Sequence, residues 1–542
     1  MKLKKNLFDF ENNEFYSVEI EIMKGKIHSI KPFKNYDKRL GFILPGLIDS
    51  HIHIESSMLV PSRFSEFAVK HGVVSVVADP HEITNVLGVD GFNFMYEDSK
   101  LSPLKIYFAV PSCVPATKYE TSGAVLSSEK IDKLLSLPNV VALGEMMNFP
   151  GVINDDQDVH DKINCAKKKN IVIDGHAPGL VGDDLLKYIS SGISTDHESS
   201  TYNEAIEKIE KGMMIQIREG SAAKNFDELW KLIDEYPDKV MLCTDDSHPD
   251  DLEFMYIDSL IKRGLKRGLK IKNLYKAAFF NPINHYGLND IGQLKVGCNA
   301  DFILLDDINE FEIKQTYING KLVYDKGNVL FDVKKGKILN NFNANKIDTK
   351  DLLIDVTGKY INIIKAFDSL LFTDLIKLEI VNNSFAVDTE KDYLKIVVLN
   401  RYQKNIKPII GYINGFGLKK GALASSIAHD SHNIIAIGTN DEDIVSAINK
   451  IIDIKGGIVV ADNKSLNFLK LEVAGLITYQ EPKIVANKYK ELNSLVRQLG
   501  SQLNSPFMTM SFMALLVIPK LKIGDKGLFD VTKFNYVNLF ED

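Results

Sequence analysis

The sequence is poor in the residues that mark several common classes of protein. It has four cysteines, and no two of them lie within three residues of each other, so the Cys-x-x-Cys pairs of zinc ribbons and redox enzymes are absent. Only seven of the 65 basic residues are arginine. The formal net charge is −7, which lacks the basic surplus typical of proteins that bind nucleic acid or a membrane surface.

Long hydrophobic runs are also missing. The longest apolar stretch, FMALLVIP (512–519), is much shorter than the roughly 20 residues that a membrane-spanning helix needs. The first residues, MKLKKNLFDFENNEF, carry basic side chains but no apolar segment of the kind found in signal peptides. We therefore expect a soluble cytoplasmic protein without membrane or nucleic-acid partners. With 542 residues, of which 45% are hydrophobic, it should form about three globular domains.

Two β-rich segments frame the first part of the chain. Residues 14–33 alternate apolar and polar side chains around a Lys-Gly turn, which predicts a small antiparallel sheet. A similar pattern returns over 301–332. We assign residues 1–45 and 295–345 to one small β domain. The last region, 346–542, mixes strand-like runs such as LKIVVLN with helical patterns, and we expect an α/β or α+β domain there.

Short apolar runs alternate with stretches of helical periodicity between the β-rich segments. The runs are ILPGLIDSHIH (43–53), VVSVVAD (73–79), LKIYFAV (104–110), NVVALGE (139–145), NIVIDGH (170–176), GISTDH (192–197), GMMIQIR (212–218) and KVMLCTD (239–245). Eight buried strands that alternate with helices are the pattern of a (β/α)8 barrel, which we predict over 46–294. The sixth run is the weakest and is included partly because the spacing is regular.

The ends of these runs are rich in metal-ligand residue types. Catalytic residues of such barrels lie at the carboxyl ends of the strands, and residues i and i+2 of a strand point to the same face. The predicted ligands are His51, His53, Glu145, His176, His197 and Asp245. Alone, the His-x-His pair is ordinary packing more often than a metal site, Glu145 could be a salt-bridge partner and Asp245 a helix cap. Their conjunction at strand ends favours a metal centre.

This ligand set exceeds what one closed tetrahedral site holds, so we expect two divalent ions. Nitrogen and oxygen ligands without thiolate suit Mn(II), Fe(II) or Zn(II). Such ions lower the pKa of bound water and supply hydroxide near neutral pH.

Other polar clusters follow the second, seventh and eighth runs. These are Asp79-Pro80-His81-Glu82, Arg218-Glu219-Gly220-Ser221 and Asp245-Asp246-Ser247-His248-Pro249. They are either caps and loop hydrogen bonds or groups for substrate contact and proton transfer.

Several segments together closely resemble the bacterial-type adenine deaminases of the amidohydrolase superfamily. They are PGLIDSHIHIESSM (45–58), VADPHEITNVLG (77–88), LGEMMNFPGV (143–152), IDGHAPGL (173–180), STDHE (194–198), REGSAAKN (218–225), CTDDSHPDDL (243–252), AHDSHNI (428–434) and GGIVVADN (456–463). The His-x-His segment is general to the superfamily, whereas DPHE, GEMMNFPGV and TDDSHP are more specific. The resemblance covers essentially the whole chain.

The resemblance implies hydrolysis of free adenine to hypoxanthine and ammonia, as in purine salvage, by a hydroxide that two metals activate, with Mn(II) favoured and Fe(II) or Zn(II) as alternatives. It implies that His51, His53 and Asp245 hold one ion, that His176 and His197 hold the other, and that Glu145 bridges them. The two β segments would form a small sandwich beside the barrel.

Several roles stay open at this stage. Asp245 is our candidate proton shuttle. Strand neighbours point to opposite faces, so only one of Asp245 and Asp246 can enter the barrel. The resemblance implies that it is Asp245, which has the position of the ligand in that family. Either Glu82 or Glu219 could protonate N1 of adenine. Arg218, His81 and His248 are candidates for substrate binding.

The role of one loop, the oligomeric state and the reaction also stay open. The loop AHDSHN, with His429, Asp430 and His432, is either a surface turn or a lid over the barrel mouth. We expect a homo-oligomer, a dimer, with adenine as the small-molecule partner. The rival interpretations are another amidohydrolase reaction, such as cyclic-amide or N-acyl hydrolysis, and a metal-binding scaffold without turnover.

Overall fold

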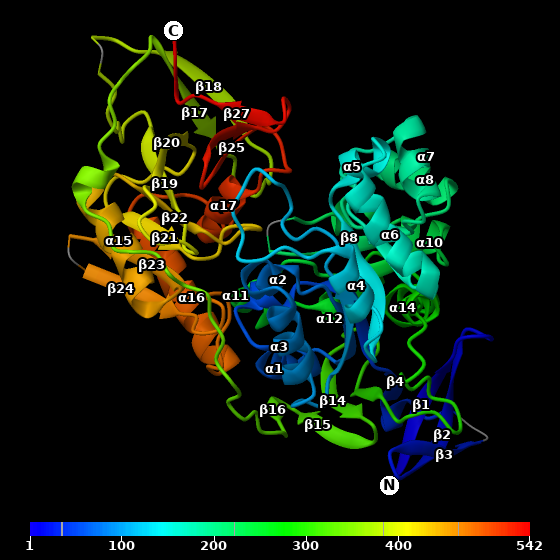
Figure 1. Cartoon of the computed structure of the whole chain (residues 1–542). Coiled ribbons are helices and arrows are strands. Elements are labelled where there is room, and N and C mark those ends of the chain that lie inside the picture. Colours follow the sequence, from blue (N-terminus) through cyan, green and yellow to red (C-terminus); the bar gives the residue numbers. More distant parts are fainter. Residues whose placement is uncertain (34–35, 222, 383, 464) are drawn as a thin grey trace.

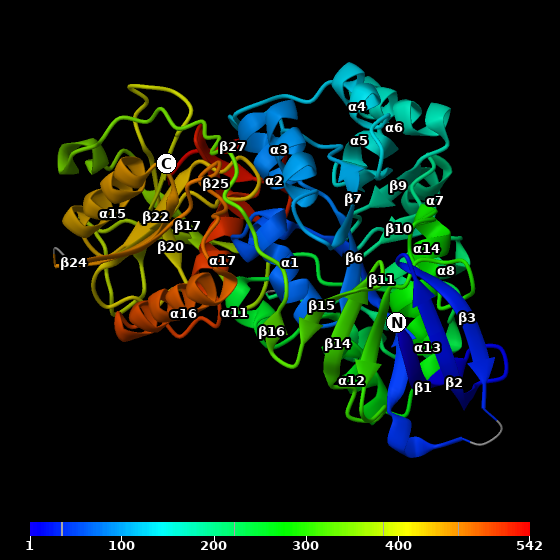
Figure 2. The same ribbon diagram turned by 90° about the horizontal axis from the view of Figure 1, so that it is seen from below.

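The structure is a computed structural model that describes residues 1–33, 36–221, 223–382, 384–463 and 465–542. A barrel occupies the centre of the chain, a curled sheet from both flanks lies at one end of it, and the C-terminal region lies beside it (Figures 1 and 2). No helix within these ranges is both long and apolar enough to cross a membrane.

The predicted barrel strands are all present in the described chain. They are β5 (Leu47–Ile52), β6 (Val73–Ala78), β7 (Lys105–Val110), β8 (Val140–Met146), β9 (Val172–Gly175), β10 (Thr195–Asp196), β11 (Met214–Arg218) and β12 (Val240–Cys243). Strands β5 to β9 and β10 to β12 form two parallel sheets. The weak sixth run is only a two-residue strand. The (β/α)8 prediction is confirmed.

Backbone hydrogen bonds join the two parallel sheets into a closed barrel. Ser194 N–H donates to the Ile173 carbonyl at 3.0 Å, which links β10 to β9. On the other side, Asp245 N–H donates to the His51 carbonyl at 3.0 Å, and His53 N–H donates to the Asp245 carbonyl at 3.2 Å. The closing seam therefore runs through three predicted metal ligands, so closure of the barrel also places them.

Helices cover the outside of the barrel because its strands are apolar on both faces. The consecutive residues Tyr107, Phe108 and Ala109 of β7, for example, point to alternate faces and are all buried. The covering helices include α1 (Pro61–Lys70), α2 (His81–Leu87), α3 (Val89–Ser99), α4 (Ser128–Leu134), α6 (Gln157–Lys169), α7 (Gly182–Ser190), α8 (Tyr202–Glu210), α12 (Ile257–Lys266), α13 (Ile271–Tyr275) and α14 (Asn281–Tyr286).

The two β-rich flanks form one sheet, in the order β16-β15-β14-β13-β4-β1-β2-β3. Its strands are β1 (Lys2–Asp9), β2 (Glu14–Met23), β3 (Lys26–Pro32), β4 (Phe42–Pro45), β13 (Phe302–Leu305), β14 (Ile313–Ile318), β15 (Lys321–Asp325) and β16 (Asn328–Val329). The sheet curls around its own apolar core, in which the rings of Phe302 and Tyr317 stack at 4.4 Å. The curl brings Gly25 against the Asn319 carbonyl, where a Cβ atom would lie at 2.7 Å.

The C-terminal region is an α+β structure, which decides between the two expected classes. Its main sheet has the order β18-β17-β20-β19-β22-β21-β23-β24, mostly antiparallel. Its strands are β17 (Tyr360–Lys365), β18 (Asp374–Glu379), β19 (Leu394–Leu399), β20 (Ile409–Asn414), β21 (Ala422–Ser425), β22 (Ile434–Gly438), β23 (Gly457–Asp462) and β24 (Ser465–Lys470). Helix α15 (Asp441–Ile454) packs on this sheet, and α16 (Pro482–Gln498) contacts α1 and α11 (Pro249–Leu252) of the barrel. A small sheet, β25 (Leu521–Gly524), β26 (Gly527–Asp530) and β27 (Asn535–Val537), completes the region.

One buried ion pair secures the short strand β10. Lys208 of α8 is fully buried and lies 2.8 Å from Asp196, the residue before the predicted ligand His197. Its ammonium also contacts Glu204 and the Ala177 carbonyl, both at 2.8 Å. Because β10 has so few ladder bonds of its own, the pair compensates for weak strand pairing.

We predict that Lys208→Met lowers the free energy of unfolding by about 3–5 kcal/mol, since it leaves a buried carboxylate without its cation. The matched control is Lys211→Met, which removes a partly exposed pair with Glu207 on the same helix and should cost at most about 1 kcal/mol. Urea unfolding of both variants tests this. Equal losses would show that the Lys208 pair adds nothing beyond a surface contact.

Candidate metal centre and active site

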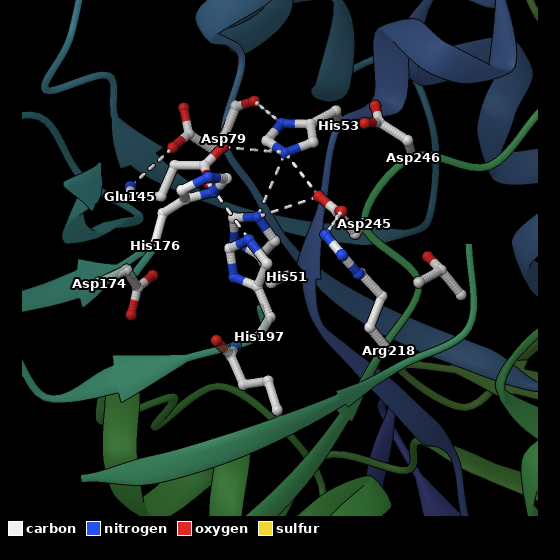
Figure 3. Close-up of polar contacts among 12 residues, drawn as sticks. His51, His53, Asp79, Glu145, Asp174, His176, His197, Arg218, Asp245 and Asp246 are labelled. Carbon is white, nitrogen blue, oxygen red and sulfur yellow. Dashed lines mark hydrogen bonds and ion pairs between the residues drawn. The ribbon is translucent and has the colours of Figure 1, made fainter. Parts of the chain in front are cut away.

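The carboxyl ends of the barrel strands bring the predicted metal ligands together at the mouth of the barrel (Figure 3). His51 lies in β5, His53 follows it, and their Nε2 atoms are 3.2 Å apart. The ring of His197 stacks on that of His51 at 4.4 Å. Two ring nitrogens at this distance share at most one proton, so at least one of them presents a lone pair.

Glu145 lies between the two groups of histidines. Its Oε1 atom is 3.2 Å from His53 Nε2, while its Oε2 atom is 2.7 Å from His176 Nδ1 and 3.2 Å from His197 Nε2. Burial raises the pKa of the Glu145 carboxyl, but the imidazoles outweigh it and hold the pKa well below its usual range. A carboxylate with one oxygen toward each group has the geometry of a bridging ligand.

Asp79 orients two of these side chains, a role that the sequence did not reveal. Its carbonyl lies 2.9 Å from His53 Nδ1, so in the neutral ring that nitrogen carries the proton and Nε2 presents a lone pair. Its carboxylate accepts the Glu145 N–H at 3.0 Å. Gly144 makes room for this contact, because a Cβ there would lie 2.2 Å from Asp79 Oδ2.

Asp245 joins the cluster from just beyond β12. Its Oδ1 atom is 2.9 Å from His53 Nε2 and 3.5 Å from His51 Nε2, and its Oδ2 atom is 2.5 Å from Arg218 Nη1. Burial raises the pKa of Asp245, but Arg218 and the imidazoles outweigh it and keep the pKa well below the usual value.

The prediction that Asp245 and Asp246 point to opposite faces of a strand is wrong. The strand ends at Cys243, and Asp245 has φ of 57°, in the left-handed region, so regular alternation stops before this pair. Asp246 accepts a hydrogen bond from Ser56 and, in Figure 3, lies on the same side as His53.

The cluster has the properties of a site for cations. In the described part of the chain, Nδ1 of His51 and Nδ1 of His197 are buried without a hydrogen-bond partner. Ligand atoms of His51, His53 and Asp245 lie within 4.8 Å of one another, as do those of His51, Glu145 and His197. Buried imidazoles and carboxylates in this number need compensating charge, which divalent metal ions provide.

His81 and Glu82 extend the site at the start of α2. His81 Nδ1 is 3.4 Å from Glu145 Oε1, and its ring lies 4.4 Å from that of His53. Glu82 contacts His429 and His432, which come from the loop between β21 and β22. Both loop histidines are buried, at 4% and 1% exposure, so the surface-turn interpretation is wrong. The loop lies at the barrel mouth.

The remaining candidates lie at different places. Arg218 pairs with Asp245 and with Glu198, whose Oε2 atom is 3.1 Å from Nη2; Glu198 directly follows His197 and was missed. The structure does not bring Glu219 to the cluster, because its carboxylate pairs with Arg263 at 2.5 Å. His248 lies at the contact with α16.

His248 Nδ1 is 2.6 Å from the hydroxyl of Tyr489, a residue of α16. Burial lowers the pKa of His248 to about 3, so the ring is neutral. The contact joins the loop after β12 to the C-terminal region.

A large cavity of about 1760 Å³ opens between the barrel mouth and the C-terminal region. Its lining includes Cys113, Met146, Glu198 and Arg218 from the barrel and Phe372 from the C-terminal region. Its lining is both apolar and polar, as is usual for a small-molecule site.

Comparison with known proteins first defines the class. A family model described as "Amidohydrolase family" matches residues 42–323, and one described as "Adenine deaminase C-terminal domain" matches residues 371–535. The barrel and its cluster of histidines and carboxylates are thus those of an amidohydrolase.

The relatives then give the particular family. An adenine deaminase of Methanosarcina mazei is 55% identical over 540 residues, covering 97% of this chain and 96% of the relative. One of Sulfurovum sp. is 46% identical and covers 99% of both chains. The chain belongs to the adenine deaminase family. A crystal structure of an adenine deaminase aligns with 59% of this chain and 98% of its own at 18% identity, with a TM-score of 0.46; the assignment does not depend on it.

We predict that Glu145→Ala loses bound metal instead of merely slowing turnover, because Glu145 contacts both groups of histidines. Wild-type protein reloaded with Mn(II) after chelation should hold close to two equivalents, and the variant fewer than one, by elemental analysis. Glu219→Ala is the control and should keep both ions. Full metal retention in Glu145→Ala would show that the bridge lies elsewhere.

Proposed function

We propose that the protein hydrolyses free adenine to hypoxanthine and ammonia at the cluster of Glu145. The full-length identity to adenine deaminases carries this proposal, because it spans both the barrel and the C-terminal region. The rival is another amidohydrolase reaction, such as cyclic-amide or N-acyl hydrolysis. Incubation with adenine and, separately, with a cyclic ureide distinguishes them: ammonia should appear with adenine alone.

Two divalent ions fit the residues at the mouth. His51, His53 and Asp245 would hold one, His176 and His197 the other, and Glu145 would contact both. When bound, such ions supply a water of lowered pKa close to neutral pH. We propose Mn(II), with Fe(II) or Zn(II) as alternatives, since the cluster offers nitrogen and oxygen but no thiolate.

Asp245 and Glu82 would handle the protons of the reaction. Water oxygen adds to C6 of adenine while Glu82 gives a proton to N1, which prevents negative charge from building on the ring. Asp245 takes one proton of the attacking water and passes it to the amino nitrogen, which leaves as ammonia. The C6–O bond replaces the C6–N bond, and the last hydroxyl proton returns to Glu82 as the carbonyl forms.

The ring would lie between the cluster and the cavity lining. We propose that His81 and Arg218 contact the purine, since His81 adjoins both Glu82 and Glu145 and Arg218 lines the cavity. His248 is a weaker candidate, because its Nδ1 already hydrogen-bonds with the Tyr489 hydroxyl. We also propose that the enzyme acts in cytoplasmic purine salvage as a homodimer, a state that light scattering of the purified protein tests.

We predict that Asp245→Asn lowers kcat by about 10²–10⁴-fold, because the amide keeps the shape and one ligating oxygen but cannot accept the proton. Much of the bound metal should remain. Asp246→Asn is the matched control, since Asp246 lies next in the chain and contacts Ser56. Near wild-type turnover in Asp245→Asn together with an inactive Asp246→Asn would reverse the assignment.

We also predict that Glu82→Gln lowers kcat by at least about 10²-fold, because an amide cannot exchange the proton of N1. Glu219→Gln should leave kcat within about twofold, since Glu219 pairs with Arg263 away from the cluster. Steady-state ammonia release measures both. The opposite pattern would make Glu219 the proton donor.

A further inference from the structure

Glu82 is held mainly by residues that are remote in the chain. Its Oε1 atom is 2.5 Å from His429 Nδ1 and 3.4 Å from His81 Nε2, and its Oε2 atom contacts His432 Nε2. The carboxylate is 2% exposed. Of these neighbours only His81 comes from the barrel, so the barrel by itself leaves one carboxylate oxygen without its hydrogen-bond donor. Burying a carboxylate without hydrogen-bond donors on both oxygens raises the free energy of the folded protein.

The tautomer of His432 follows from its other contact. Its Nδ1 atom accepts the Ala428 N–H at 3.3 Å, so in the neutral ring the proton lies on Nε2, which then donates to Glu82. Burial lowers the pKa of His432 to about 4, outweighing the effect of Glu82, so the ring is neutral. His432 is therefore a donor of fixed direction.

Buried groups of the C-terminal region hold the loop in this conformation. The fully buried Arg401 donates from Nη1 to the carbonyls of His432 at 3.3 Å and Ser426 at 3.5 Å. The ring of His429 stacks on Phe512 at 4.5 Å with an angle of 16° between the planes. Both imidazoles thus have their orientation set by the C-terminal core.

The loop also contacts the barrel at a second point. Asn433 Nδ2 donates to the Thr121 carbonyl, in the loop after β7, at 2.9 Å. The position of the two histidines relative to Glu82 is therefore set from both sides.

We propose that the loop 428–433 completes the active site, with His429 and His432 as positioning residues that hold the Glu82 carboxylate toward the metal cluster. This inference rests on the proposed function and deepens it, since it gives the C-terminal region a part in proton transfer. Without the two donors, Glu82 would be free to change rotamer, and misplacement of a reacting group by about 1 Å can cost about 10²-fold in rate.

His429 also keeps a proton next to Glu82. Burial lowers the pKa of His429, but the Glu82 carboxylate outweighs it and raises the pKa to about 9, so the imidazolium is present at neutral pH. The proton can move from Nδ1 to Oε1 and on to N1, and it returns through Glu82 when the product carbonyl forms. Proton number is conserved over the cycle.

The test is a double-mutant cycle in the full-length, Mn(II)-loaded enzyme. His432→Ala should lower kcat by about 10²-fold, with KM changed less than about threefold and bound metal unchanged. Its melting temperature should fall, because the buried carboxylate loses a donor, and His432→Gln should restore it. In the Glu82→Gln background the same substitution should change kcat less than about threefold, because its effect passes through Glu82. His429→Ala should behave in the same way.

Two further variants separate positioning from folding. His432→Gln keeps an N–H donor and should recover at least about tenfold of the lost rate. Ser431→Ala, in the same loop, should keep wild-type kcat, because its hydroxyl accepts a hydrogen bond from Asn433 Nδ2 and takes no part in holding Glu82.

The outcomes are distinguishable. Two results would overturn the positioning role while the deaminase activity stands. One is an equal loss of kcat in the wild-type and Glu82→Gln backgrounds. The other is a loss of bound metal or a fall in melting temperature in His432→Ala that His432→Gln does not relieve. No ammonia from adenine with the wild-type enzyme would overturn the proposed function, and this inference with it.

Discussion

The contact on which the rest of the site depends is that of the Glu145 carboxylate with the histidines on either side of it. One oxygen faces His53 and the other faces His176 and His197, so strands β5, β8, β9 and β10 must all end at the same level. Parallel strands in a closed barrel satisfy this requirement, because all their carboxyl ends meet at one mouth. Asp79 and Gly144 then set the height and direction of the carboxylate within that mouth.

The cluster also explains why buried ion pairs lie next to the candidate ligands. The Lys208–Asp196 pair stabilises the shortest strand immediately before His197, and the Arg218–Glu198 pair lies beside Asp245. These groups lie under or next to the candidate ligands, and each restricts a side chain or strand end that would otherwise move. Preorganisation of this kind is what a centre made from residues of many separate strands requires.

The C-terminal region is part of the same arrangement. It contributes His429 and His432 beside Glu82 and part of the cavity wall. Tyr489 of α16 contacts His248 in the loop after β12. Buried residues of its core, such as Arg401, also hold the loop that faces the barrel.

The sequence by itself determined the strands and the candidate ligands, because buried parallel strands are continuous apolar runs and each ligand directly follows one of them. Even the weakness of the run before His197 corresponds to the short strand β10. Only the tertiary structure decided the rest. Regular strand alternation does not extend to Asp246, because Asp245 before it has a left-handed conformation. Glu219 pairs with Arg263, and the AHDSHN loop is buried against Glu82. These outcomes depend on contacts between residues far apart in the chain, whose positions no local pattern of apolar and polar residues specifies.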